Sequence, residues 1–257
     1  MATTVSDRGG DADRYRAAQR GLTRLLVRDA RGLRRLIIPS RLRTSVPDWI
    51  AAMQAVIEQY AQTSAALGAE FYEAQREAAS APGSFTVPVA DPPAEARTEA
   101  SLRWATKDVW DRDPEQASEA QRQPLAVRLE QAAKKAELVS QKLVADTGRA
   151  TVLDAVREDR QATAWARSAA LGACAFCKMI ASRGSVFAQD TVRFRAHDGC
   201  HCGVIPVFRG QRFEPSPQAA EWARLYQEYA AGHSGSQLAR FRRALAEHDS
   251  NPLPGAF

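Results

Sequence analysis

The chain has 257 residues, of which 45% are apolar, and a formal net charge of +5. This length is sufficient for one large domain or two modest ones with a buried core. The sequence contains no long hydrophobic run, so we expect no membrane-spanning segment. Its N-terminus lacks the apolar stretch of a secretory signal, which predicts synthesis in the cytoplasm.

Positive charge is concentrated at the N-terminus. Residues 1–45 hold eleven arginines and four aspartates, a surplus of seven positive charges, whereas the whole chain carries +5. The remaining residues therefore sum to −2. We interpret residues 1–45 as a basic helical arm.

The arm is predicted to form an amphipathic helix over residues 13–37. Its apolar face has leucines at helical spacing: Leu22, Leu25, Leu26, Leu33 and Leu36. Another face carries a row of arginines: Arg16, Arg20, Arg24, Arg28, Arg31 and Arg35.

This arginine row has two readings. Guanidinium groups bind phosphate and carboxylate in pairs, so the row predicts a surface for packaged DNA or for an acidic partner. The alternative is a solvated helix face without a specific partner. Tyr15 is the only aromatic residue among the arginines, so contact with DNA is expected to involve the phosphate backbone and to weaken with salt.

Residues 46–160 are predicted to form a helical body. Pro47 is expected to open a helix that ends near residue 79, because the first helical position tolerates a missing N–H. A proline-rich crossing follows at residues 81–93. Further helices are expected at 94–110, 124–146 and 149–159, with a break at Thr147-Gly148.

Beyond residue 160 the pattern changes. Residues 161–214 are predicted to form a small α+β module, with strands at 162–169, 185–188, 192–195 and 203–208 and a short helix at 178–182. Residues 215–257 are predicted to hold two helices, at 218–231 and 236–247, and a mobile tail. His233 and His248 are expected at the surface.

The expected fold class is thus α+β and mostly α. It consists of a long-helix N-terminal body, a small strand-containing Cys/His module and two C-terminal helices.

All four cysteines lie in that module, in two groups. The first is Cys174-x-x-Cys177, and the second, His197-x-x-Cys200-x-Cys202, is preceded by a histidine. This spacing is typical of the two halves of a structural zinc site. Tetrahedral zinc takes four ligands, so one of the five candidates is spare, and both a four-cysteine set and a three-cysteine set with His197 remain open. His201 would point to the opposite face of an extended segment and is excluded.

Three other readings compete with zinc. A thioredoxin-like redox pair at Cys174 and Cys177 would leave the second group without a role. Two structural disulfides would suit a protein that leaves the cell inside a particle, and plain buried thiols do not explain such tight grouping. Thiolate-rich zinc sites are usually closed and structural, so we predict a structural Zn²⁺ that staples a small module.

The cysteine region also carries a family resemblance. The run CAFCKMIASRG from Cys174, then HDGCHC from His197 and IPVF from Ile205, resembles the Mu F-type minor head proteins of tailed bacteriophages, in the form found in phages of actinobacteria. The resemblance covers about residues 150–210. It implies a head morphogenesis protein of the virion, made in the host cytoplasm and associated with the portal protein and other capsid proteins at the portal vertex. Members are often labelled capsid maturation proteases, which these residues do not show.

No catalytic residue is assigned. Ser182 or Ser185 could form a triad with His197 and an aspartate, Asp190 or Asp198, only on paper, because no nucleophile-elbow motif is present. The sequence favours a non-enzymatic role in head assembly and DNA packaging. A maturation protease and a DNA-contacting internal head protein are the alternatives.

Overall fold

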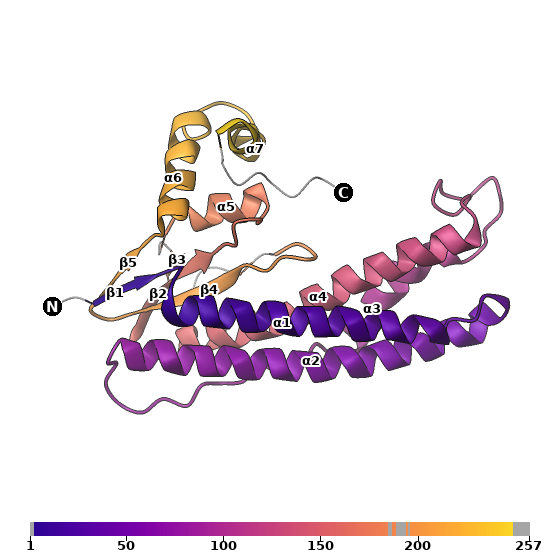
Figure 1. Ribbon diagram of the computed structural model, residues 1–257, viewed down its shortest axis with the longest axis horizontal. Coiled ribbons are helices and arrows are strands. Elements are labelled where there is room, and N and C mark those ends of the chain that lie inside the picture. The colour runs from indigo at the N-terminus through magenta and orange to yellow at the C-terminus, as the bar shows by residue number, and fades with distance from the viewer. Residues whose placement is uncertain (1–2, 185–186, 189–193, 195, 249–257) are drawn as a thin grey trace.

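The computed structural model describes residues 3–184, 187–188, 194 and 196–248. Figure 1 shows an elongated body of long helices that meets, at one end, a small sheet and a pair of C-terminal helices. The expected fold class, α+β and mostly α, is confirmed. None of the helices in the described ranges is both long and apolar enough to cross a membrane.

Four helices build the body: α1 (Gly10–Leu33), α2 (Leu42–Ala78), α3 (Glu95–Thr106) and α4 (Leu125–Glu158). Short 3-10 turns follow α1 at Arg34–Leu36, precede α2 at Pro39–Arg41 and follow α3 at Lys107–Val109. The proline-rich segment 81–93 has no helix or strand and runs along the body, as expected.

The leucine face predicted for α1 is confirmed in part: Leu22 and Leu26 pack in the core of the helical body and Leu33 packs at its edge, whereas Leu25 and Leu36 are exposed. Leu26, Met53 and Ile57 are fully buried in this core, and Leu102 of α3 joins them. Burying a side chain of this kind stabilises the fold by about 1.5–3 kcal/mol. This core contains none of the cysteines and holds the long helices together.

The expected break at Thr147-Gly148 is wrong, because α4 continues through both residues. Gly148 marks a helix crossing: a Cβ there would lie 2.6 Å from Ser64 Oγ and 2.7 Å from the Ser64 carbonyl oxygen of α2. Gly68 of α2 meets α4 in the same way, since its Cβ would lie 2.7 Å from the Gly148 carbonyl oxygen. The two glycines allow the backbones to approach closely.

The expected start of α2 at Pro47 is also wrong. The helix begins at Leu42 and contains Pro47 in its second turn. Proline there removes one ladder bond, the one to the Arg43 carbonyl. Ser45 stabilises the start of the helix, because its hydroxyl accepts a hydrogen bond from the Ile38 N–H at 3.0 Å.

A three-stranded antiparallel sheet of order β3-β2-β4 forms the module: β2 (Ala162–Ser168), β3 (Phe187–Ala188) and β4 (Gly203–Phe208). The strands predicted at 162–169 and 203–208 are confirmed. The strand predicted at 192–195 falls on residues that, except for Phe194, lie outside the described part, as do residues 185–186.

A second, two-stranded sheet has no counterpart in the sequence predictions. In it β1 (Thr3–Ser6) pairs in parallel with β5 (Gln211–Glu214). Just after β1, the buried Asp7 carboxylate accepts hydrogen bonds from the Ser216 N–H at 2.7 Å and the Ser216 hydroxyl at 3.1 Å. The N-terminus is thereby tied to the start of the C-terminal helices.

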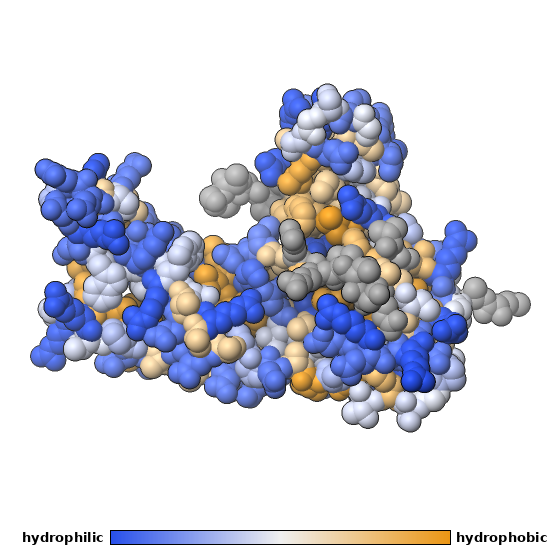
Figure 2. Space-filling view, turned by 180° about the vertical axis from the view of Figure 1, so that it is seen from behind, coloured by the Kyte–Doolittle hydropathy of each residue, from blue (hydrophilic) through white to orange (hydrophobic). Residues whose placement is uncertain are grey.

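Helices α5 (Ala175–Ala181), α6 (Pro217–Tyr229) and α7 (Gln237–His248) complete the fold. The helix α5 begins three residues earlier than the predicted 178–182. Figure 2 shows a largely hydrophilic body on the face opposite to Figure 1, with apolar surface gathered mainly below the α6–α7 pair.

The sheet does not have a core of its own. Tyr72 of α2, Val152 of α4 and Trp165 of β2 belong to one buried cluster with Phe208 of β4. The division into a body and a module at residue 160 stays a prediction, and this shared core spans it.

Candidate metal centre

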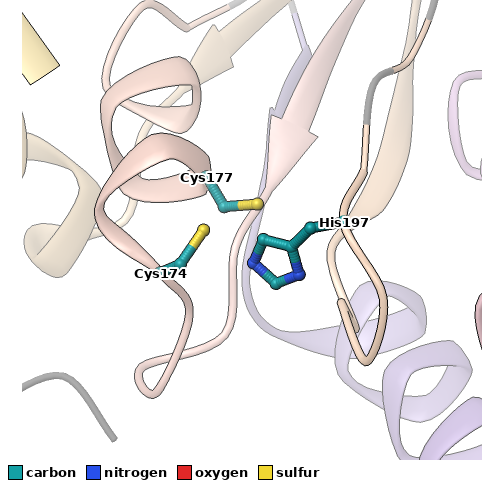
Figure 3. A group of neighbouring side chains, drawn as sticks. All are labelled: Cys174, Cys177 and His197. Carbon is teal, nitrogen blue, oxygen red and sulfur yellow. The ribbon is translucent and has the colours of Figure 1, made fainter. Parts of the chain in front are cut away.

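Two loops bring the cysteine groups together. Cys174 caps the N-terminus of α5 and Cys177 lies in its first turn, whereas His197, Cys200 and Cys202 precede β4. A turn from His197 to Cys200, closed by a 3.2 Å backbone hydrogen bond, passes through Gly199 at a φ of 72° that favours glycine. Figure 3 shows the side chains of Cys174, Cys177 and His197 converging from the two loops.

The ligand atoms form two groups that share Cys177. Within each group, Cys174–Cys177–His197 and Cys177–Cys200–Cys202, the atoms lie within 4.8 Å of one another. The Sγ atoms of Cys177 and Cys200 are 3.5 Å apart. Two thiolates on one tetrahedral zinc ion, at about 2.3 Å each, lie about 3.8 Å apart, so this spacing suits a shared ion. The five side chains could hold a metal ion.

Burial separates these candidates. Cys177, Cys200 and Cys202 are buried, Cys174 is half-buried and His197 is exposed. All four thiols are free, and the 3.5 Å between Cys177 and Cys200 is far longer than the roughly 2.05 Å of a disulfide. His201 belongs to neither group.

Hydrogen bonds within the cluster favour the thiolate form at Cys174 and Cys200, whereas hydrogen bonds with Cys174, Cys200 and Cys202 raise the pKa of Cys177. The Cys177 thiol lowers the pKa of Cys174 to about 5, with a further contribution from His197. Hydrogen bonds from Cys177 and Cys202, followed by the charge of Arg149, lower the pKa of Cys200. Thiolate is the form that binds metals, so Cys174 and Cys200 are prepared for a cation, and a metal ion would displace the protons of Cys177 and Cys202.

Two buried arginines flank the cysteines. Arg149 of α4 donates from Nε to the Cys202 carbonyl at 2.8 Å and from Nη2 to the Cys200 carbonyl, and it pairs with Asp146 at 2.7 Å. Arg167 of β2 lies with its Nη1 3.5 Å from Cys177 Sγ. Their positive charges offset those of the thiolates, and Arg149 fixes the loop between Cys200 and Cys202.

Sequence reasoning missed both arginines. Arg149 was expected to open a short separate helix, and Arg167 lies in a predicted strand without a motif. Each guanidinium also stacks on the Phe194 ring, at 5.2 Å and 3.7 Å from its centroid respectively. No spacing rule links α4 or β2 to the cysteines, so only the packing reveals these contacts.

Replacement of Arg149 by methionine is expected to weaken metal binding about 10–100-fold, the usual effect of losing a group that orients metal ligands. The physical reason is that the carbonyls of Cys200 and Cys202 lose their shared donor. Competition with a chromogenic chelator measures the affinity. Arg157→Met on the same helix is the control, because Arg157 pairs with Asp154 at the surface. Equal affinities in the two variants would contradict the role given to Arg149.

The six arginines of the predicted row differ in their exposure to solvent. The placement of Arg16 on the binding surface is wrong: its guanidinium is buried and donates to the Asp7 carbonyl at 2.6 Å and to the Ser168 hydroxyl. The other five arginines are exposed: Arg20, Arg24, Arg28, Arg31 and Arg35. Arg31 forms a two-pronged pair with Glu137 of α4, at 3.0 Å for each bond, and Arg28 pairs with Asp29 at 2.9 Å.

A protein-family model described as VG15 protein matches residues 7–229. The chain belongs to the VG15 family of phage proteins. The VG15 match contains the arginines of α1 and all five candidate metal ligands, and it ends with α6. No curated protein and no solved structure matches the chain.

The residues considered for proteolysis either have other contacts or lie outside the described part of the chain. Within the VG15 match, the Ser182 hydroxyl donates to the Met179 carbonyl at 2.8 Å at the end of α5. The His197 ring lies beside Cys174, and its Nδ1 is 2.8 Å from the Asp198 carbonyl oxygen. Ser185 and Asp190 lie outside the described residues.

Proposed function

We propose that the chain is a minor protein of the phage head that acts at the portal vertex in head assembly and contains a structural zinc ion. The observation that carries this proposal is the convergence of the two cysteine groups in a VG15 chain. These groups are the residues that carry the resemblance to the Mu F-type minor head proteins, and that resemblance supplies the portal-associated role.

Zinc is the metal that this donor set favours. Soft thiolate ligands with an imidazole nearby suit zinc, whereas magnesium and calcium take oxygen ligands. Cys177, Cys200 and Cys202 would hold the ion, with Cys174 or His197 as the fourth ligand. When bound, the ion supplies a cross-link between α5 and the loop that precedes β4.

A structural role accounts for the surroundings better than a catalytic one. Catalytic zinc sites keep a position open for water or substrate, whereas thiolate-rich sites are usually closed. The cysteines lie in a buried cluster with Trp222 of α6 and Phe241 of α7, separate from the core that the sheet shares with the long helices, and a small cluster of this kind gains most from a staple. Zinc would therefore stabilise the surface on which partners assemble.

Purification of the portal protein from cells that co-express this chain tests the proposal. We expect the chain to co-purify with the portal, and electron microscopy of the particle to locate it at the portal vertex. A chain found only in the tail, or absent from assembled heads, would contradict the assignment.

A second candidate function, contact with packaged DNA, is favoured by the exposed arginines of α1 and of the 3-10 turn that follows it. Arg24 and Arg35 have no ion-pair partner within the described ranges, and Arg28 keeps 70% of its side chain exposed. Backbone phosphates are suitable partners for such a row, because they bind guanidinium groups without demanding a base sequence.

DNA binding across a salt series tests this second function. The affinity of the chain for duplex DNA is expected to fall with a slope of about −0.9 in log–log form per phosphate contacted. The triple variant Arg24→Gln, Arg28→Gln and Arg35→Gln should flatten the slope, whereas Arg224→Gln should not, because Arg224 is held by Glu221 and Glu228. A DNA affinity that does not change with salt concentration would exclude the arginine row as a DNA surface.

A further inference from the structure

A cleft of about 770 Å³ opens beside the cysteine cluster. Its floor is formed by Cys174, His197 and the loop that ends at Cys202, and its sides come from α1, α5 and α7. Figure 1 shows α5 and α7 above the first half of α1. This volume is within the range of about 300–1,000 Å³ that is usual for ligand pockets.

The rim of the cleft carries positive charge. Arg20 of α1 and Arg242 of α7 line it from opposite elements, and both are exposed. Among the described residues, none that lines the cleft is a carboxylate, and no acidic side chain forms an ion pair with either guanidinium. This contrasts with Arg224 on the neighbouring α6, which two glutamates hold.

The floor does not cancel this charge. A thiolate-rich metal centre is negative on its own, but Arg149 and Arg167 lie buried directly against it. Their positive charges offset the thiolates, because Asp146, which pairs with Arg149, is itself shared with Lys142 and Arg97. An anion that enters the cleft therefore meets Arg20 and Arg242 without strong repulsion from the metal centre.

The rest of the wall is apolar or small. It consists of Ala170, Gly172, Ala173, Ala175 and the half-buried ring of Phe176. A suitable ligand thus combines separated negative charges with an apolar group between them. An extended peptide with acidic and aliphatic side chains has this character, whereas a DNA duplex is too wide and too uniformly charged to enter.

We propose that this cleft binds an acidic peptide segment of a partner protein. Its carboxylates pair with Arg20 and Arg242, and an aliphatic side chain packs on Phe176. The segment would join α1 to α7 across the metal centre. This proposal concerns the chemistry of the cleft and holds whether or not the partner belongs to the phage head.

Fluorescence anisotropy with a labelled synthetic peptide of Asp, Glu and Leu tests the proposal on the full chain as purified. Loss of a charge-assisted pair is worth about tenfold in affinity, so we expect Arg20→Gln and Arg242→Gln each to raise the dissociation constant about tenfold. The control is Arg14→Gln with Arg243→Gln, because these exposed residues belong to the same two helices, do not line the cleft and are not part of the arginine row. The control should bind the peptide as the unaltered chain does.

Several results would overturn the proposal. These are no binding of the acidic peptide, equal binding of a peptide with Asn and Gln in place of Asp and Glu, and equal weakening in the control. Preferential competition by a DNA oligonucleotide would assign the two arginines to nucleic acid instead. Since both side chains are exposed, the variants should keep the circular dichroism and melting temperature of the unaltered chain, which makes a loss of binding interpretable.

Discussion

Replacement of Cys177 by serine is expected to abolish stoichiometric metal binding and to loosen the module around α5. The Sγ atom of Cys177 belongs to both ligand groups, and the Cys177 side chain is fully buried. Structural zinc contributes about 10–16 kcal/mol to the folding of small peptides, so loss of a central ligand should cost several kcal/mol. Metal analysis and thermal unfolding measure the two effects.

The long helices should survive this change, because their core of Leu26, Met53 and Ile57 contains none of the cysteines. Far-ultraviolet circular dichroism should therefore change little while the Trp222 environment near the cysteines changes. Ser182→Ala is the control, since that hydroxyl donates to the Met179 carbonyl and belongs to neither ligand group. A Cys177→Ser variant that keeps its metal and its melting temperature would contradict the proposed centre.

The same approach identifies the fourth ligand. His197→Ala and Cys174→Ser can be compared, because both residues belong to the first ligand group and neither belongs to the second. If zinc takes four cysteines, His197→Ala should retain the ion and Cys174→Ser should lose it. If His197 is the fourth ligand, the order is reversed.

Replacement of Gly148 by alanine is expected to destabilise the helical body by about 3 kcal/mol, the upper part of the range for overpacking. The added methyl group would lie 2.6 Å from Ser64 Oγ and 2.7 Å from the Ser64 carbonyl oxygen. A main-chain atom of a packed helix cannot move aside cheaply, so α2 and α4 must separate. In a protein of this size each kcal/mol lowers the melting temperature by about 2–4 °C, which calorimetry resolves.

Gly21→Ala is the matched control for this prediction. Gly21 also lies within a helix, but a Cβ there would meet no heavy atom within 4 Å. Alanine favours a helix by about 1 kcal/mol relative to glycine, so Gly21→Ala should be neutral or stabilising. If both variants behave alike, helix propensity and not the α2–α4 crossing governs Gly148.

The sequence allowed prediction of what local pattern determines. The spacing of Leu22 and Leu26 in α1 indicated its buried face, and the apolar run at residues 203–208 indicated β4. The spacing of Cys174, Cys177, Cys200 and Cys202 was sufficient to predict that the two groups meet, because a shared ion requires it. These features depend on residues close in the chain or on one strong motif.

Features set by distant contacts could not be predicted in this way. Gly148 has the local signal of a helix break, but its role is decided by Ser64 on another helix. Arg16 fits the spacing of a surface row, yet the Asp7 carbonyl and Ser168 draw it inward. The pairing of β1 with β5 joins opposite ends of the chain, and neither strand is long enough to give a clear pattern.

The most direct test of the account is the zinc content of the purified chain, combined with X-ray absorption at the zinc edge. The account predicts about one zinc ion per chain with sulfur as the main ligand, at about 2.3 Å. A metal-free chain with its four cysteines joined in two disulfides, or zinc bound only by nitrogen and oxygen, would contradict it.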